Sequence, residues 1–146
     1  MESVHICIQL GINDVFGALD DKSLDGTLAP EYLKNMQHII DSIHKYDPDI
    51  KVVWHLVLPG STDEAKFKYA YEMSQTAERY KRNTYLTNLK IIELAEEMEN
   101  VYVVPTNAAL NTEDNMAASG HGAVHPGKLG YEDIATQLYS FIRAIN

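Results

Sequence analysis

Three short apolar runs, each followed by a polar turn and a helical pattern, are the feature that most constrains the fold of this chain. They read VHICIQL (4–10), KVVWHLVLP (51–59) and VYVVP (101–105). Each run is apolar on both faces and rich in β-branched residues, which is typical of parallel strands covered by helices on both sides. The order β-α-β-α-β-α with right-handed crossovers predicts an α/β protein with three layers, α/β/α. At 146 residues, the chain is expected to form a single domain, 1–146.

The segments between and after these runs have helical patterns. The first covers 30–48, the second covers about 63–99 with a break near Asn83, and the third covers 131–145. Apolar residues at helical spacing predict the face that each helix buries. The predicted faces are Leu33, Met36, Ile39, Ile40 and Ile43 in the first helix, Leu86, Leu89, Ile92 and Met98 in the second, and Tyr131, Ile134, Leu138, Phe141 and Ile145 in the third.

Charge and composition argue against several classes of partner. Twelve basic against 21 acidic residues give a net charge of −9, and no Lys/Arg cluster forms a stripe, so no nucleic-acid partner is expected. No apolar run approaches the roughly 20 residues of a membrane-spanning helix, so no membrane span is expected. The start MESVH has an acid where a signal peptide carries positive charge, which favours a cytoplasmic location. The single cysteine, Cys7, cannot form an internal disulfide and is predicted to pack as a small hydrophobe.

Polar residues follow the first strand directly, in the turn Gly11-Ile12-Asn13-Asp14. In an open parallel sheet, the loops at the carboxyl ends of the strands gather at one rim, where ligands bind. An Asn13 side chain held there can donate its amide N–H to a substrate oxygen, as an oxyanion hole requires. The alternative is that Asn13 and Asp14 only form an Asx turn that caps the next segment.

A histidine occupies the loop before the last predicted helix. His125 precedes Pro126, and Gly127 and Gly130 flank the entry to the helix in HGAVHPGKLGY (121–131). A histidine fixed on such a loop at the same rim is well placed to act as a general base.

The stretches LGIND and VHPGKLGY, near opposite ends of this β/α frame, resemble the SGNH hydrolases, also called the GDSL esterase/lipase family. Gly11, Asn13 and Asp14 match the family's G-x-N-D turn, and His125 and Pro126 match its late H-P segment. The resemblance implies a flavodoxin-like fold, a small ester or acylated carbohydrate as substrate, and no cofactor or metal. It implies that Asn13 and Gly11 belong to the oxyanion turn and that His125 is the catalytic base. Members encoded by bacteria and their phages look similar, which makes a virion-associated location the alternative to a cytoplasmic one.

The sequence departs from the family pattern in two places. No G-D-S occurs in it, so the segment that carries the family's nucleophilic serine is missing, and the chain begins at what looks like the third strand of the fold. The triad acid three residues before the histidine is replaced by Gly122. We therefore expect the C-terminal portion of the fold, truncated at the N-terminus and inactive or incomplete as an esterase by itself.

Other residues are candidates for the missing groups. Ser61 follows the second strand and can act as nucleophile, although with Glu64 it also forms a predicted capping box. Ser119 lies in the histidine loop and is a weaker candidate. Ser3 is set aside, because it precedes its strand and so lies at the opposite end of the sheet from the rim. Glu113 or Asp114 can replace the acid by folding back onto His125, or a backbone carbonyl can orient the imidazole instead.

The sequence also gives expectations for the remaining histidines and for the edge of the first strand. His121 and His125 lack the helical context of a zinc pair, so no metal site is expected. The other histidines are predicted to be structural; they are His5, His38, His44 and His55. Strand 4–10, apolar on both faces, is predicted to be covered by a second copy of the chain or by a partner. The alternative to a hydrolase is a non-catalytic carbohydrate-binding or assembly module of a phage or cell-surface particle.

Overall fold

The computed structural model describes residues 3–17, 30–72, 74–117 and 122–146. Within these ranges, three parallel strands form one sheet in the order β1-β2-β3. They are β1 (His5–Ile8), β2 (Lys51–His55) and β3 (Val101–Val104). Cys7 pairs with Val53, and Val53 pairs with Tyr102 on its other side. The predicted parallel sheet is confirmed, although each strand is shorter than its apolar run.

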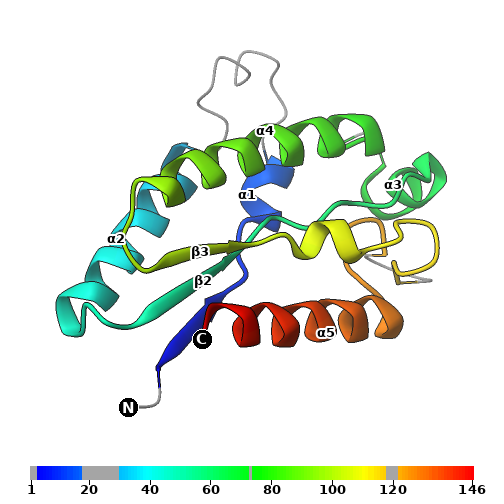
Figure 1. Ribbon diagram of the computed structural model, residues 1–146. Coiled ribbons are helices and arrows are strands. Elements are labelled where there is room, and N and C mark those ends of the chain that lie inside the picture. Colours follow the sequence, from blue (N-terminus) through cyan, green and yellow to red (C-terminus); the bar gives the residue numbers. More distant parts are fainter. Residues whose placement is uncertain (1–2, 18–29, 73, 118–121) are drawn as a thin grey trace.

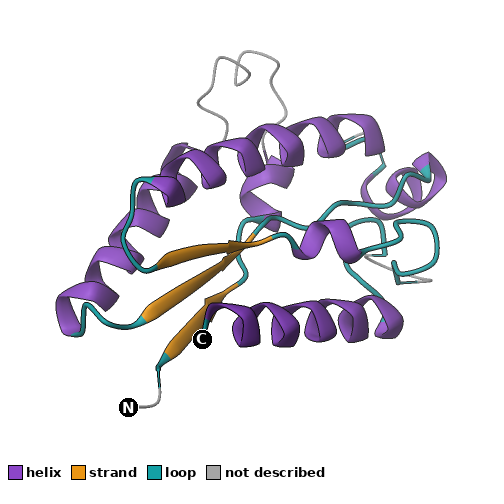
Figure 2. Ribbon diagram, viewed as in Figure 1, coloured by secondary structure: helices purple, strands orange, loops and turns teal. Residues whose placement is uncertain are grey.

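Helices cover both faces of the sheet, so the predicted α/β/α layering is also confirmed (Figure 1). The helices of the described residues are α1 (Ile12–Gly17), α2 (Pro30–Tyr46), α3 (Glu64–Tyr71), α4 (Ala77–Glu96), the 3₁₀ helix η2 (Thr106–Ala109) and α5 (Lys128–Ile145). Helices α2 and α4 lie on one side of the sheet and α5 lies on the other (Figure 2). None of these helices is both long enough and apolar enough to cross a membrane.

The main core lies between the sheet and the layer formed by α2 and α4. Trp54 of β2 is fully buried there against Met36 and Ile40 of α2 and Tyr80 of α4. A smaller cluster on the α5 side joins Leu58, Leu110 and Ile134. Burial of these side chains on both faces explains why β2 is apolar throughout.

The predicted helix break near Asn83 is wrong. The chain breaks earlier, because Glu72 adopts a positive φ of 54° and Thr76 caps α4 by accepting a hydrogen bond from Arg79 N at 3.2 Å. Asn83 lies within α4, is 1% exposed, and donates to the carbonyl oxygen of Val15.

The predicted apolar face of α4 is wrong at two of its four residues, since Leu86 and Met98 are partly buried and the other two are exposed. Leu89 and Ile92 are 40% and 36% exposed, whereas Thr87 and Asn88 face inward. The Asn88 amide accepts from the N–H of Val57 at 2.8 Å and donates to its carbonyl at 3.0 Å. Val57 follows the end of β2, where its backbone N–H and carbonyl have no partners in the sheet. The Asn88 side chain points inward from α4 because it satisfies both of these buried groups.

The faces of α2 and α5 are confirmed apart from one residue in each. On α2, Ile39 is 40% exposed while its predicted partners are buried or partly buried. On α5, Tyr131 is 52% exposed, Ile134 is buried, and the others are partly buried.

Candidate active site

The turn between β1 and α1 depends on a glycine. Gly11 has a φ of +112°, and a Cβ there would lie 2.8 Å from Val57 Cγ2 and 3.0 Å from Tyr32 Cζ. A side chain at this position would therefore be strained by its backbone and crowded by its neighbours. The turn leads directly into α1, whose second and third residues are Asn13 and Asp14. Both of these side chains are exposed.

The backbone of the turn does not use Asn13 for an Asx turn. Such a turn requires the N–H of Val15, two residues later, to donate to the Asn13 side chain. That N–H instead donates to the carbonyl oxygen of Gly11 at 2.9 Å. The first turn of α1 is thus closed by backbone, which leaves the Asn13 amide available to a ligand.

A buried pair of aromatic residues supports the same turn from the side of α2. The Tyr32 hydroxyl donates to the carbonyl oxygen of Leu10 at 3.2 Å and accepts from Trp54 Nε1 at 3.1 Å. Burial raises the pKa of Tyr32 to about 12, and the negative charge of Asp14 adds to the rise. The phenol therefore stays protonated and holds the strand end in place. The sequence does not predict this pair, because no local pattern links residues 22 positions apart.

The loop that carries His125 is fixed by backbone pairing. Met116 and Pro126 form an antiparallel bridge, and Ala117 N donates to the His125 carbonyl at 3.0 Å. Asn115 ties the loop to α5 through an amide that donates to Asp133 Oδ2 at 3.0 Å. Pro126 is buried, whereas the His125 side chain is exposed.

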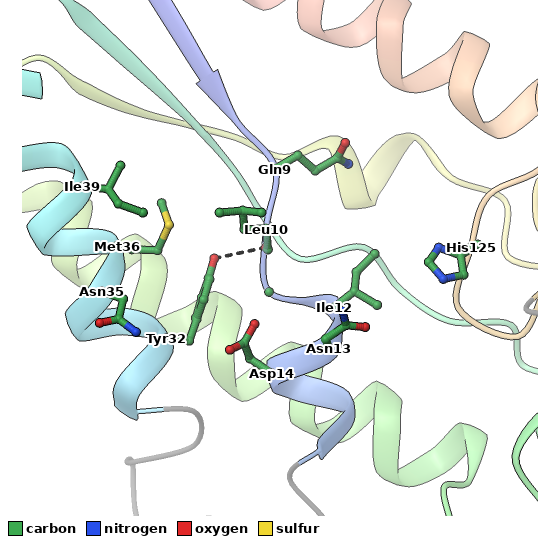
Figure 3. Close-up of a pocket in the computed structure, with 11 residues that line it drawn as sticks. Gln9, Leu10, Ile12, Asn13, Asp14, Tyr32, Asn35, Met36, Ile39 and His125 are labelled. Carbon is green, nitrogen blue, oxygen red and sulfur yellow. Dashed lines mark hydrogen bonds between the residues drawn. The ribbon is translucent and has the colours of Figure 1, made fainter.

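Asn13 and His125 line one cleft of about 390 Å³. Figure 3 shows both on the same side of the β1–α1 turn, with Ile12 between them. The opposite wall comes from α2, where Tyr32, Asn35, Met36 and Ile39 line the cleft. Asn13 and His125 are predicted from the sequence to lie at one rim of the sheet, and the structure brings them to one cleft.

Ser61 lies outside the described lining of this cleft. Its side chain is 3% exposed, and its Oγ accepts a hydrogen bond from Asp63 N at 3.1 Å. The predicted capping box is wrong, since Asp63 caps α3 by accepting from Ala65 N at 2.8 Å. Glu64 instead accepts from the N–H of Glu78. Ser119, the other candidate nucleophile, lies outside the described residues.

A side chain has no room at Gly122, the residue that the resemblance aligns with the family's triad acid. A Cβ on Gly122 would lie 1.9 Å from the carbonyl oxygen of Ala117, closer than real atoms approach. Of the substitute acids, Glu113 and Asp114 are both exposed, and Asp114 Oδ2 accepts from the Asn111 amide at 2.8 Å. Which group orients His125 stays a prediction.

Two other histidines, His44 and His55, do not line this cleft. His55 is 3% exposed, its Nδ1 lies 3.4 Å from Thr106 Oγ1, and burial lowers its pKa, so it packs as a neutral side chain. His44 Nε2 lies 3.1 Å from the carbonyl oxygen of Ile50. Within the described part of the chain, no three His, Cys, Asp or Glu side chains are placed to hold a metal ion. His121, considered from the sequence together with His125 as a zinc ligand, lies outside the described residues.

Comparisons with known proteins agree with this geometry. The model of the GDSL-like lipase/acylhydrolase family matches residues 3–132. No curated protein matches the chain. Among solved structures, a Streptococcus pneumonia protein named for platelet activating factor has a TM-score of 0.69 at 20% identity, covering 94% of this chain and 59% of that one. A GDSL-like lipase from Bacteroides thetaiotaomicron has a TM-score of 0.62 at 20% identity, with 98% and 63% covered.

A third solved structure, a member of the lipolytic G-D-S-L family from Veillonella parvula, has a TM-score of 0.57 at 18% identity, with 93% and 61% covered. The chain thus spans about three-fifths of the length of these structures, and at such identities the likeness shows the fold. The family model covers most of the chain, including the G-x-N-D turn and the H-P segment. The chain belongs to the GDSL-like lipase/acylhydrolase family.

Proposed function

We propose that the cleft binds the acyl group of a small ester or of an acylated carbohydrate. In this proposal the Asn13 amide donates to the carbonyl oxygen as it gains negative charge, and His125 acts as the general base. One observation carries the proposal: a candidate oxyanion donor and a candidate base, separated by almost the whole sequence, line the same cleft. Gly11 contributes by fixing the turn that aims Asn13.

The nucleophile is the group that the described cleft lacks. None of the described residues lining it is a serine, threonine or cysteine, and the chain contains no G-D-S. In the family reaction, a serine hydroxyl attacks the acyl carbon, its proton passes to the histidine, and the histidine then protonates the leaving alcohol. We propose that the 146 residues supply the oxyanion donor and the base but do not turn over esters without an added serine.

A tetrahedral anion tests the binding half of this proposal without any serine. Ethyl methylphosphonate, titrated and followed by NMR, is expected to shift the Asn13 and His125 signals. Asn13→Ala should weaken binding about tenfold, because a hydrogen bond to a charged group is lost. The matched control is Asn35→Ala, which removes the same amide from the α2 wall of the cleft and should change binding little. Equal losses in the two variants, or shifts outside the cleft, would contradict the assignment.

A fluorophosphonate probe tests the nucleophile half. The chain alone is expected to remain unlabelled, and labelling of Ser61 would contradict the proposal directly. No labelling together with specific carbohydrate binding would favour the second candidate function, a non-catalytic carbohydrate-binding or assembly module. The observation that favours this second candidate is the same lack of a serine, threonine or cysteine among the described cleft residues.

We also propose that a second copy or a partner chain covers the free edge of β1. Among the described strands, β1 pairs with β2 alone. A groove of about 740 Å³ lies along this edge between β1 and α2, and Val4, Ile6, Ile43 and Tyr46 are among the residues that line it. Val4 is 55% exposed and Tyr46 87% exposed. An apolar edge without a charge or a proline tends to pair with another strand.

Sedimentation velocity tests self-association at this edge. The chain is expected to sediment as a dimer at micromolar concentration, and Ile6→Lys should shift it to a monomer. Ile92→Lys is the matched control, because Ile92 is partly exposed on α4, away from β1. A monomeric chain at every concentration would exclude the second copy and leave a partner chain as the remaining form of the proposal.

A further inference from the structure

The cleft carries a single fixed charge among its described residues. Asp14 is its one Asp, Glu, Lys or Arg, and the other polar side chains besides His125 are the amides of Gln9, Asn13 and Asn35 and the Tyr32 hydroxyl. Where both partners are described, the ion pairs join Lys90 to Glu93 and Lys128 to Glu132, and neither involves Asp14. An unpaired carboxylate at a cleft attracts cations and repels anions.

Asp14 lies on the opposite side of the β1–α1 turn from Asn13 and His125 (Figure 3). Figure 3 shows its carboxylate toward Tyr32 and α2, whereas Asn13 and His125 lie on the other side. Its charge is felt by the Tyr32 hydroxyl, whose pKa it helps to raise, so the two groups are close. The cleft is therefore divided into an acyl end at Asn13 and His125 and an α2 end at Asp14.

The α2 end combines this charge with apolar surface. Its exposed apolar surface comes from Ile39, which is 40% exposed, whereas Met36 and Tyr32 line it with side chains that are 1% and 5% exposed. A carboxylate beside apolar side chains suits an alkylammonium group, which offers both a positive charge and methyl or methylene surface. The net charge of −9 attracts such a cation over a longer range.

We propose that Asp14 makes the cleft selective for esters whose alcohol part carries a positively charged alkylammonium group. The inference rests on the proposed function in one respect: the acyl group must occupy the end with Asn13 and His125, which leaves the alcohol part at the α2 end. Asp14 then acts as a specificity residue and takes no part in bond making or breaking. Esters with an anionic alcohol part are disfavoured by the same charge.

Two ligands of the same shape test the role of the charge. Choline and 3,3-dimethylbutan-1-ol differ in a quaternary nitrogen that replaces a carbon, so their apolar contacts are matched. NMR titration at pH 8 and low salt is expected to give about fivefold tighter binding of choline, as for a partly exposed ion pair. The shifts should map to Asp14, Asn35 and Met36. Asp14→Asn should reduce the ratio of the two affinities to about one.

The control for net charge is Asp41→Asn, an exposed position of α2 that does not line the cleft. It should keep the fivefold ratio and its salt dependence. Equal affinities in the unchanged chain, a ratio that survives Asp14→Asn, an equal fall in Asp41→Asn, or shifts outside the cleft would each overturn the inference. The proposed function fails separately, in the phosphonate titration of Asn13→Ala, because ethyl methylphosphonate has no cationic alcohol part.

Discussion

Gly122→Asp is expected to lower the free energy of unfolding by about 3 kcal/mol or more, and not to complete a catalytic triad. The reason is the 1.9 Å between the Cβ it would add and the carbonyl oxygen of Ala117. The obstacle is backbone, so no side-chain rotation relieves it. Urea unfolding measures the loss of stability. The NMR signals of Met116 and Pro126, which form a backbone bridge, report whether the His125 loop stays formed.

Two variants separate crowding from charge at this position. Gly122→Ala adds the Cβ alone and should lose nearly as much stability as Gly122→Asp. At Gly127, in the same loop, the nearest atom to a Cβ is 3.4 Å away, so Gly127→Ala should change stability by less than about 0.5 kcal/mol. If Gly122→Asp were as stable as the unchanged chain, the loop would be able to accept an acid, and the explanation by crowding would be wrong.

Gly11→Ala is expected to have the second large effect, a loss of about 3 kcal/mol in the free energy of unfolding. An alanine there must adopt a φ of +112° and place its Cβ 2.8 Å from Val57 Cγ2. If the turn moves to relieve this crowding, Asn13 moves with it, so the binding of ethyl methylphosphonate should weaken as well. Urea unfolding and the phosphonate titration measure the two losses.

The control for Gly11→Ala is a variant that weakens the support of the turn without adding an atom to it. Tyr32→Phe removes the hydroxyl that donates to Leu10 and accepts from Trp54. It should lose about 1–2 kcal/mol, less than Gly11→Ala, because only hydrogen bonds are lost. A Gly11→Ala variant with unchanged stability and phosphonate affinity would show that the positive φ is not required.

The two glycines also show where family resemblance alone is insufficient. Gly11 matches the family motif, and the structure gives a physical reason for a glycine there. Its φ is positive, and Val57 and Tyr32 leave no room for a side chain. Gly122 departs from the motif, and the crowding at Ala117 shows that the loop is packed around a residue without a side chain.

The sequence by itself determined the parallel three-layer fold and the meeting of Asn13 with His125. Apolar runs without alternation indicate burial on both faces, which holds for β2; in β1 the prediction that Cys7 packs as a small hydrophobe is wrong, because Cys7 is exposed. Parallel strands bring the turns after them to one edge. Neither inference needs a contact between particular side chains, so composition and order were sufficient.

Only the tertiary structure decided the rest of the cleft and the rotation of α4. The amide of Asn88 turns inward because the backbone of Val57 needs partners after β2 ends, which outweighs the apolar pattern of Leu89 and Ile92. Tyr32 reaches Leu10 through a contact across 22 positions, and its helix brings the wall that faces Asp14. Such contacts depend on which groups remain unsatisfied once the sheet has formed, and that information is not local in the sequence.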